Sequence, residues 1–295
     1  MVKKNLHLSG VMIHTFMIFV AVITIMPFVL AITSSLTHER DIFISGYSFF
    51  PSMGFTTAAY EFIFRNPSQL LRSLFISVSS TAIGTILGTS ITLALGYTLT
   101  RKDYPLRKPI AFYVFFTMIF NGGIVPYYIM IAGTFGLLNT FWVLLIPFLC
   151  NAFFVLLAKG MMGSVPAEIV ESAKIDGANE FGIYSKVILP ISKPAIATVG
   201  LFIAISYWND WMTSLYFINS PRLFTLQYSL VRISQNIQNM ALEMQFSGGA
   251  FQAMDTPMYT ARMAMGVLVT LPILCVFPFI QKYFEKGIVI GSVKG

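Results

Sequence analysis

Residues 109–158 contain no Asp, Glu, Lys or Arg, and this uncharged run constrains the fold more than any other feature. A helix that crosses the roughly 30 Å hydrocarbon core of a bilayer needs about 20 apolar residues, so the run is long enough for two crossings. Turn-forming residues at 133–139 divide it. Only 11% of the 295 residues are charged, against about 25% in a soluble domain. The chain is therefore predicted to be a membrane protein, and soluble enzymes, nucleic-acid-binding proteins and disordered chains are disfavoured.

Counting charge-poor intervals of this length predicts an all-α, polytopic membrane protein with six transmembrane helices. The first interval is too long for a signal-peptide core of about 7–15 residues and lacks a small-residue cleavage site, so it is expected to be retained. The spans are predicted at about 11–33, 73–100, 109–131, 139–158, 194–218 and 263–281. Together they are expected to form one transmembrane domain, residues 1–295, with an inner loop at 161–193 and outer loops at 34–72 and 219–262.

The placement of Lys and Arg predicts the orientation of the spans, because cytoplasmic loops carry an excess of both. With six spans the two termini share a side. If both are inside, every Lys is inside, and the cations left outside are all Arg on long loops: Arg40, Arg65, Arg72, Arg222, Arg232 and Arg262. Both termini are therefore predicted to be cytoplasmic.

Helix-breaking residues interrupt several predicted spans. Asn121-Gly122-Gly123, followed by Pro126, is the sharpest interruption. Because non-helical backbone at membrane depth persists only inside protein or beside water, this turn is expected to face a cavity. The prolines in the spans fit either plain packing geometry or a bundle that bends to open a path. Gly84 and Gly88 form a small-residue pair, which predicts a close helix-packing face.

The chemistry that would mark an enzyme is missing from the sequence. No phosphate-binding G-x-x-x-x-G-K-[ST], H-E-x-x-H or C-x-x-C motif occurs, and the three His residues are scattered. No catalytic residue, metal site or cofactor is therefore predicted in this chain. Asp210 is predicted about 24 Å along the fifth span, near its outer end, where it is poorly placed as a midplane proton relay. The sequence thus predicts a path whose energy comes from a partner.

The loop between the fourth and fifth spans reads as two short helices joined at Gly177. Pro166 suits a first helical position and Glu168 an N-terminal turn. Gly177 is free to adopt positive φ and to end the first helix. The second helix, about 178–188, is expected to place Phe181, Tyr184, Val187 and Ile188 on one side. An amphipathic loop on the membrane surface and a helix presented to a cytoplasmic partner both fit this pattern.

The residues of this loop resemble the EAA loop of binding-protein-dependent ABC importer permeases. Ser172 replaces the middle Ala of that motif, and Gly177 follows Glu171 at the family's spacing. The resemblance implies that the 166–190 loop forms the coupling helices on a cytoplasmic ATPase. The residues that carry this role by resemblance are Glu171, Ser172, Ala173, Asp176, Gly177, Ala178, Ile188, Leu189 and Pro190.

The second half of the chain extends the resemblance. Two segments resemble those of the maltose-permease-like branch, namely Trp208-Asn209-Asp210-Trp211 and the tail at 283–295. The whole chain resembles complex-oligosaccharide permeases of Gram-positive bacteria. The resemblance implies import of a carbohydrate across the bacterial plasma membrane. It also implies an ATPase pair that binds the ATP and magnesium, a second permease chain as a heterodimer partner, and an extracellular solute-binding protein.

The sugar path is predicted from aromatic and hydrogen-bonding side chains near the broken spans. The candidates are Asn121, Tyr127, Tyr128, Trp208, Asn209 and Asp210. The Trp residues fit equally well an aromatic belt at the membrane interface. A self-sufficient carrier or channel is the alternative function, and a membrane enzyme is a third that lacks a catalytic cluster.

Overall fold

The computed structural model describes residues 8–65, 67–246 and 256–292, and these ranges are helical with no strand. The chain divides into two compact units. Unit 1 is Met1–Pro67 with Arg232–Pro272, and unit 2 is Ser68–Val231 with Ile273–Gly295. The prediction for the end of the tail falls on residues 293–295, which lie outside the described residues.

Unit 1 is built on long apolar helices with short helices in the connection between them. The first predicted span is α1 (Leu8–Ser35), which is apolar on all sides and continues through Pro27. Its large side chains are exposed from Val11 to Val29, as expected for a helix whose solvent is lipid. The sixth predicted span lies within α15 (Tyr259–Ser292), which belongs to unit 1 as far as Pro272, and the segment after α1 holds α2 (Glu39–Ser45) and α3 (Ala58–Ile63).

A buried carboxylate joins two segments of unit 1 that are far apart in the sequence. Glu39, only 6% exposed, accepts hydrogen bonds from the backbone N–H groups of Tyr259 (2.7 Å) and Thr260 (3.0 Å) and from the Thr260 hydroxyl (2.7 Å). These N–H groups belong to the first turn of α15, where a helix has donors without internal partners and favours negative charge. Glu39 therefore caps α15 from a segment more than two hundred residues away.

We expect Glu39→Gln to lower the free energy of unfolding by about 1–3 kcal/mol, because a neutral amide cannot satisfy all three buried donors. The matched control is Glu61→Gln, since Glu61 is exposed and its carboxylate accepts from Thr57 within its own helix turn. Thermal unfolding of the purified protein in detergent measures both. Equal melting temperatures for the two variants would contradict the capping role.

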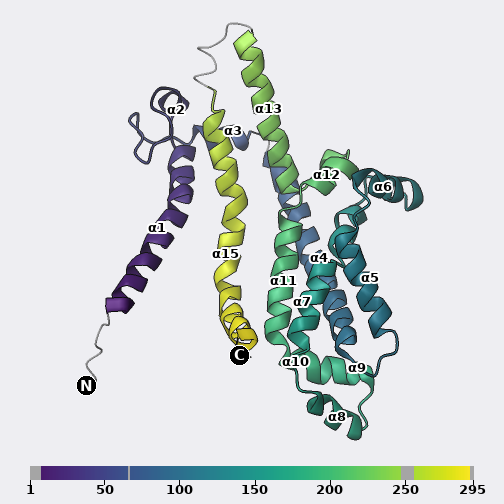
Figure 1. Cartoon of the computed structure of the whole chain (residues 1–295). Coiled ribbons are helices and arrows are strands. Elements are labelled where there is room, and N and C mark those ends of the chain that lie inside the picture. The colour runs from purple at the N-terminus through teal and green to yellow at the C-terminus, as the bar shows by residue number, and fades with distance from the viewer. Residues whose placement is uncertain (1–7, 66, 247–255, 293–295) are drawn as a thin grey trace. The chain divides into compact units, whose positions relative to one another are not determined.

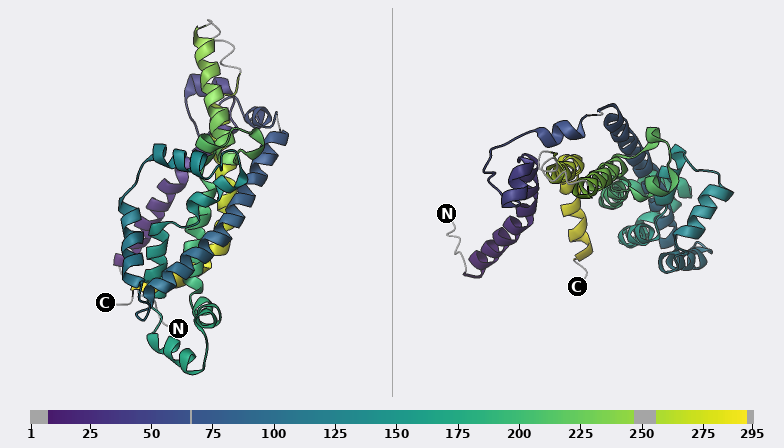
Figure 2. Two further views of the ribbon diagram at one scale, coloured as in Figure 1. Left: turned by 90° about the vertical axis from the view of Figure 1, so that its right-hand side faces the viewer. Right: turned by 90° about the horizontal axis from the view of Figure 1, so that it is seen from above.

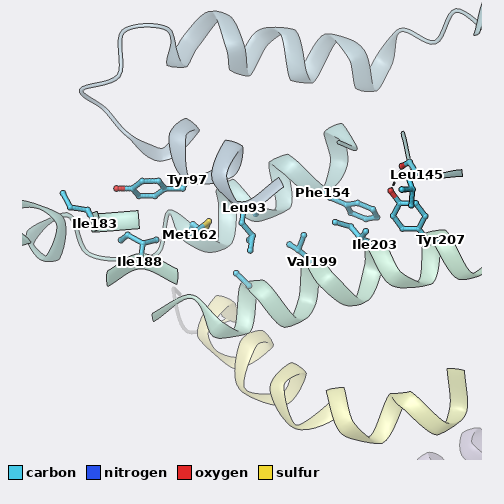
Figure 3. Close-up of a cluster of buried hydrophobic side chains, with 12 residues drawn as sticks. Leu93, Tyr97, Leu145, Phe154, Met162, Ile183, Ile188, Val199, Ile203 and Tyr207 are labelled. Carbon is cyan, nitrogen blue, oxygen red and sulfur yellow. Dashed lines mark hydrogen bonds between the residues drawn. The ribbon is translucent and has the colours of Figure 1, made fainter. Parts of the chain in front are cut away.

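Long helices lie side by side in unit 2 and enclose its core (Figures 1 and 2). They are α4 (Pro67–Thr100), α5 (Arg107–Ile119), α7 (Ala152–Met162) and α11 (Lys193–Trp208). The main core joins Leu93 of α4, Phe154 of α7 and Ile203 of α11 (Figure 3). A smaller cluster of Leu99, Val114 and Val155 seats α5 against α4 and α7. Burial of these side chains fixes the bundle.

Glycines of α4 allow its neighbours to approach closely, which confirms the predicted packing face. A Cβ atom on Gly84 would overlap the ring of Tyr207, and one on Gly88 would lie 3.3 Å from the Ile203 side chain. A Cβ on Gly96 would lie 2.7 Å from that of Ala158 and 3.0 Å from the Lys159 backbone nitrogen. The glycines thus run along the seam between α4, α11 and α7.

Three of the predicted spans differ from single straight helices. The 109–131 span bends by 115° where α5 gives way to α6 (Ile124–Ile129) and the π-helical turn η1 (Met130–Thr134). The 139–158 span bends by 49° between the 3₁₀ turns η2 (Phe141–Leu144) and η3 (Ile146–Phe148) and α7. The 194–218 span stops at the end of α11 and resumes as α12 (Met212–Phe217). Each break falls at glycine, proline or side-chain caps that compete with the helix.

By length and composition, two described helices can each cross a membrane, and up to five spans result if each bent pair counts as one. The remaining elements complete the fold. They are α8 (Ala167–Ile175), α9 (Glu180–Gly182), the π-helical η4 (Ile183–Ile188), α10 (Leu189–Ile191), η5 (Pro221–Leu223) and α13 (Leu226–Phe246).

Candidate functional site

The 163–194 segment folds into an elbow at one end of the unit 2 bundle (Figure 1). Its first arm, α8, follows Pro166 as the helix N-cap and has Glu168 in its first turn. The arm ends at Gly177, whose φ of +79° is left-handed. The Ala178 N–H donates to the Ala173 carbonyl (3.0 Å) and the Gly177 N–H to that of Lys174 (3.0 Å). This pair of bonds is a Schellman motif, so the predicted end of the first helix at Gly177 is confirmed.

The second arm of the elbow begins at α9 and packs differently from the prediction. Asn179 caps it by accepting from the Gly182 N–H (2.8 Å). Ile183 and Ile188 are fully buried in the bundle core, whereas Phe181 is 76% exposed. Phe181 therefore does not share one side with Ile188 as expected, because the π-helical turn η4 shifts the helical register after Gly182.

The elbow has a packed face and an open face. Ala173, Ala178 and Leu189 lie half-buried against the core cluster. The open face of α8 carries Ile175, which is 86% exposed, with the predicted residues Glu171 and Ser172. The predicted residues Asp176, Gly177 and Pro190 are exposed as well, and exposed Phe181 lines a pocket beside the end of α4. Exposed large apolar side chains beside charged ones are typical of a surface that another protein covers.

Four charged side chains, missed by the sequence reasoning, meet between α4 and the elbow. An Arg101 Nη2 atom lies 2.8 Å from an Asp103 carboxylate oxygen and 3.2 Å from one of Glu180. Lys174 Nζ lies 2.6 Å from that Asp103 oxygen and 3.2 Å from the Glu180 oxygen. The partners are 71 and 79 residues apart in sequence, so no local pattern predicts their meeting.

Hydrogen bonds from Arg101 and then Lys174 hold the pKa of Asp103 well below its usual range. A carboxylate with a depressed pKa stabilises the fold above its ordinary value of about 3.9 and stops doing so as pH falls through the depressed value. The same contact with Asp103 raises the pKa of Lys174. We therefore expect amide hydrogen exchange of residues 172–182, corrected for intrinsic rates, to stay unchanged from about pH 8 to pH 5. Faster opening at the acidic end would contradict the arrangement.

The interrupted third span forms a turn that lines an open cavity of about 530 Å³. Gly123 has a φ of +85°, and its N–H donates to the Asn121 side-chain oxygen (2.9 Å). Tyr127 also lines this cavity. Tyr127 packs edge-on to the ring of Phe217 (5.7 Å between centroids) and Tyr128 stacks on it (5.6 Å). The turn thus presents amide and aromatic groups together.

The second set of path candidates lies where α11 gives way to α12. Asp210 accepts a hydrogen bond from the Thr213 N–H (3.1 Å) and so caps the start of α12. Trp208 is buried, whereas Asn209 is exposed. Since α12 runs from the Asp210 cap to Phe217, it connects this set with Tyr127 and Tyr128. The interfacial-belt reading fails for Trp208, which is packed inside unit 2.

Asn139 holds the two broken spans together and was not predicted as a functional residue. It has a left-handed φ of +59°, rare for a residue other than glycine. Its N–H donates to the Phe217 carbonyl (2.9 Å), and its side-chain oxygen accepts from the N–H groups of Asn219 (3.2 Å) and Ser220 (2.9 Å). The turn composition at 133–139 was the only sequence signal for this site.

The sequence that folds into these broken helices and this elbow matches a known family. The model for the binding-protein-dependent transport system inner membrane component matches residues 8–290. The chain belongs to this family. It is a permease subunit of an ABC importer, a membrane protein and not an enzyme. Membership in a binding-protein-dependent importer implies an ATPase and a solute-binding protein as partners.

Individual relatives agree with this assignment. The permease is 37% identical over 292 residues to the polygalacturonan/rhamnogalacturonan transport system permease protein YtcP of Bacillus subtilis (strain 168), covering 99% of this chain and 100% of the relative. It is 24% identical to the maltodextrin transport system permease protein MalD of Streptococcus pneumoniae, covering 100% and 99%. One chain of a bacterial ABC transporter involved in the import of the acidic polysaccharide alginate superimposes with a TM-score of 0.78 at 26% identity, covering 96% and 99%.

Proposed function

We propose that this permease imports an oligosaccharide, with the 166–190 loop as its coupling element on the ATPase. The family match over residues 8–290 carries the proposal, and the relatives named for polygalacturonan, rhamnogalacturonan and maltodextrin transport support the carbohydrate class. The whole chain 1–295 would act as one transmembrane domain with six spans in a bacterial plasma membrane. Both termini would be cytoplasmic, as the lysine distribution favours.

The open face of the elbow supports the coupling role. A helix that docks in a groove presents apolar and charged groups together, and Glu171 and Ile175 of α8 do so. The Schellman turn at Gly177 fixes the angle between the arms, while half-buried Ala173 and Ala178 seat the elbow on the bundle core. Movement of a docked ATPase would therefore be transmitted to the spans as a rigid-body displacement.

The sugar path is proposed along the broken helices. Tyr127 and Tyr128 offer aromatic faces beside the Asn121 turn, in line with the few placed polar groups of a ligand site. Asn209 would add an exposed amide, and Asp210 and Trp208 would hold the α12 junction in place. A second, different permease chain would complete the path, and ATP and magnesium would bind to the ATPase.

Reconstitution into liposomes tests the function. With the ATPase pair, sister permease and solute-binding protein, we expect ATP-dependent uptake of oligogalacturonides or maltodextrins. Liposomes that hold this chain alone should take up neither. Uptake by the chain alone, without ATP, would contradict the proposal and favour the self-sufficient carrier or channel.

A further inference from the structure

The four charged side chains beside the elbow form a closed ring of alternating sign. Arg101 and Lys174 each contact both carboxylates, those of Asp103 and Glu180, at 2.6–3.2 Å. In such a ring, a side chain that is held in place by its first contact is already positioned to make its second contact. The conformational entropy lost for each contact is therefore smaller than in an isolated exposed pair.

The ring is anchored to the bundle core through Arg101. The Arg101 side chain is only 12% exposed and donates from Nη1 to the Tyr97 hydroxyl (3.1 Å), with its guanidinium 5.7 Å from the centre of that ring. Tyr97 is buried in the main core cluster, and its ring lies 5.4 Å from that of Tyr184. The last turn of α4 and the second arm of the elbow therefore share one anchor.

The four residues of the ring come from the end of α4 and from both arms of the elbow. Arg101 and Asp103 follow the end of α4, whereas Lys174 lies in the last turn of α8 and Glu180 begins α9. The two elbow members therefore stand on opposite sides of the Gly177 turn. Along the backbone, the elbow connects only to α7 and, through α10, to α11. The ring adds a connection to α4 that the backbone does not provide.

We propose that Arg101, Asp103, Lys174 and Glu180 form an ionic bracket, a set of positioning residues that makes α4 move with the elbow when the ATPase displaces it. This inference rests on the proposed coupling role of the elbow. The bracket holds the angle between the two arms and adds an ionic connection to α4, which the elbow otherwise contacts through apolar packing such as that of Tyr184 on Tyr97. The competing interpretation is that these four residues form ordinary exposed ion pairs without a role in transport, since most such pairs contribute little to stability.

Nitroxide labels at Lys102 and Phe181 test the bracket without any sugar. Both side chains are exposed, one beside the end of α4 and one on the elbow. The assembled transporter is measured without nucleotide and trapped with ATP and vanadate, with Cys150 and Cys275 replaced by Ala. The wild-type bracket predicts the same label distance in both states. Asp103→Asn and Lys174→Gln each predict a broadened distribution that changes between the states.

Sugar transport gives the second readout. In the same two variants we expect the oligosaccharide imported per ATP hydrolysed to fall about five-fold, while melting temperature and ATP hydrolysis stay near wild type. The Asp103→Asn/Lys174→Gln double variant should lose less than the sum of the two single losses, because both changes remove the same Asp103–Lys174 contact. The matched control is Lys186→Gln, which removes a positive charge from the same loop outside the ring.

Two results would overturn the bracket. The first is a label distance that differs between the nucleotide states in the wild type. The second is an amount of oligosaccharide imported per ATP that stays at the wild-type value in Asp103→Asn and Lys174→Gln, or that falls equally in Lys186→Gln. Neither result bears on the proposed function, which stands if the assembled wild type imports oligosaccharide. If the wild type imports none, the sugar assignment fails, and the label distances still decide the bracket.

Discussion

Replacing Gly177 with valine is expected to reduce sugar uptake by the assembled transporter strongly while the ATPase continues to hydrolyse ATP. Gly177 has a φ of +79°, where a β-branched residue is strained by about 1–3 kcal/mol. This strain lowers the population of the native elbow roughly 5- to 150-fold. No heavy atom lies within 4 Å of an added Cβ. The loss would therefore arise from the backbone and not from a clash within the chain.

Gly177→Asn is the matched control for this prediction. Asparagine is similar in size to valine but tolerates the left-handed region. Uptake per ATP, measured in proteoliposomes, should stay near wild type for Asn and collapse for Val, with equal amounts of both variants in the membrane. If the valine variant transports as well as the asparagine variant, the angle of the elbow does not matter for coupling.

Gly96→Ala is expected to destabilise the folded permease by about 1–3 kcal/mol, because overpacking forces neighbours apart. The new Cβ would lie 2.7 Å from that of Ala158 and 3.0 Å from the Lys159 backbone nitrogen. A backbone atom cannot rotate away, so α4 and α7 must separate. Leucine at this position should prevent accumulation of folded protein.

Gly160→Ala serves as the control for Gly96→Ala. Gly160 lies in α7 with no atom within 4 Å of an added Cβ, and alanine favours a helix over glycine by roughly 1 kcal/mol. Thermal unfolding in detergent should move in opposite directions for the two variants. If the Gly96→Ala protein is as stable as wild type, α4 and α7 do not pack as closely at Gly96 as the structure shows.

Local features of the coupling loop could be predicted from sequence because local chemistry determines them. Pro166 begins the first arm, and Gly177 ends it in a Schellman motif that depends on residues 173–178 alone. The Gly84 and Gly88 packing face follows equally from residue size. The first helix α1 needs only an uninterrupted apolar run.

Other features could not be predicted because distant parts of the chain determine them. The ring around Arg101 joins residues more than seventy positions apart, and Glu39 caps a helix that begins at Tyr259. The sequence predicts Asp210 as a polar candidate for the sugar path. In the structure its side chain caps α12, and this role depends on a helix break after Trp208 that the sequence does not predict. The burial of Ile183 in place of Phe181 follows from the π-helical turn, which has no reliable sequence signal.

A structure of the assembled transporter would show whether the elbow docks on the ATPase. We predict that the open face of α8, with Glu171 and Ile175, lies in a groove of the ATPase and is excluded from water. An elbow that faces bulk solvent, with no other chain on it, would contradict the account.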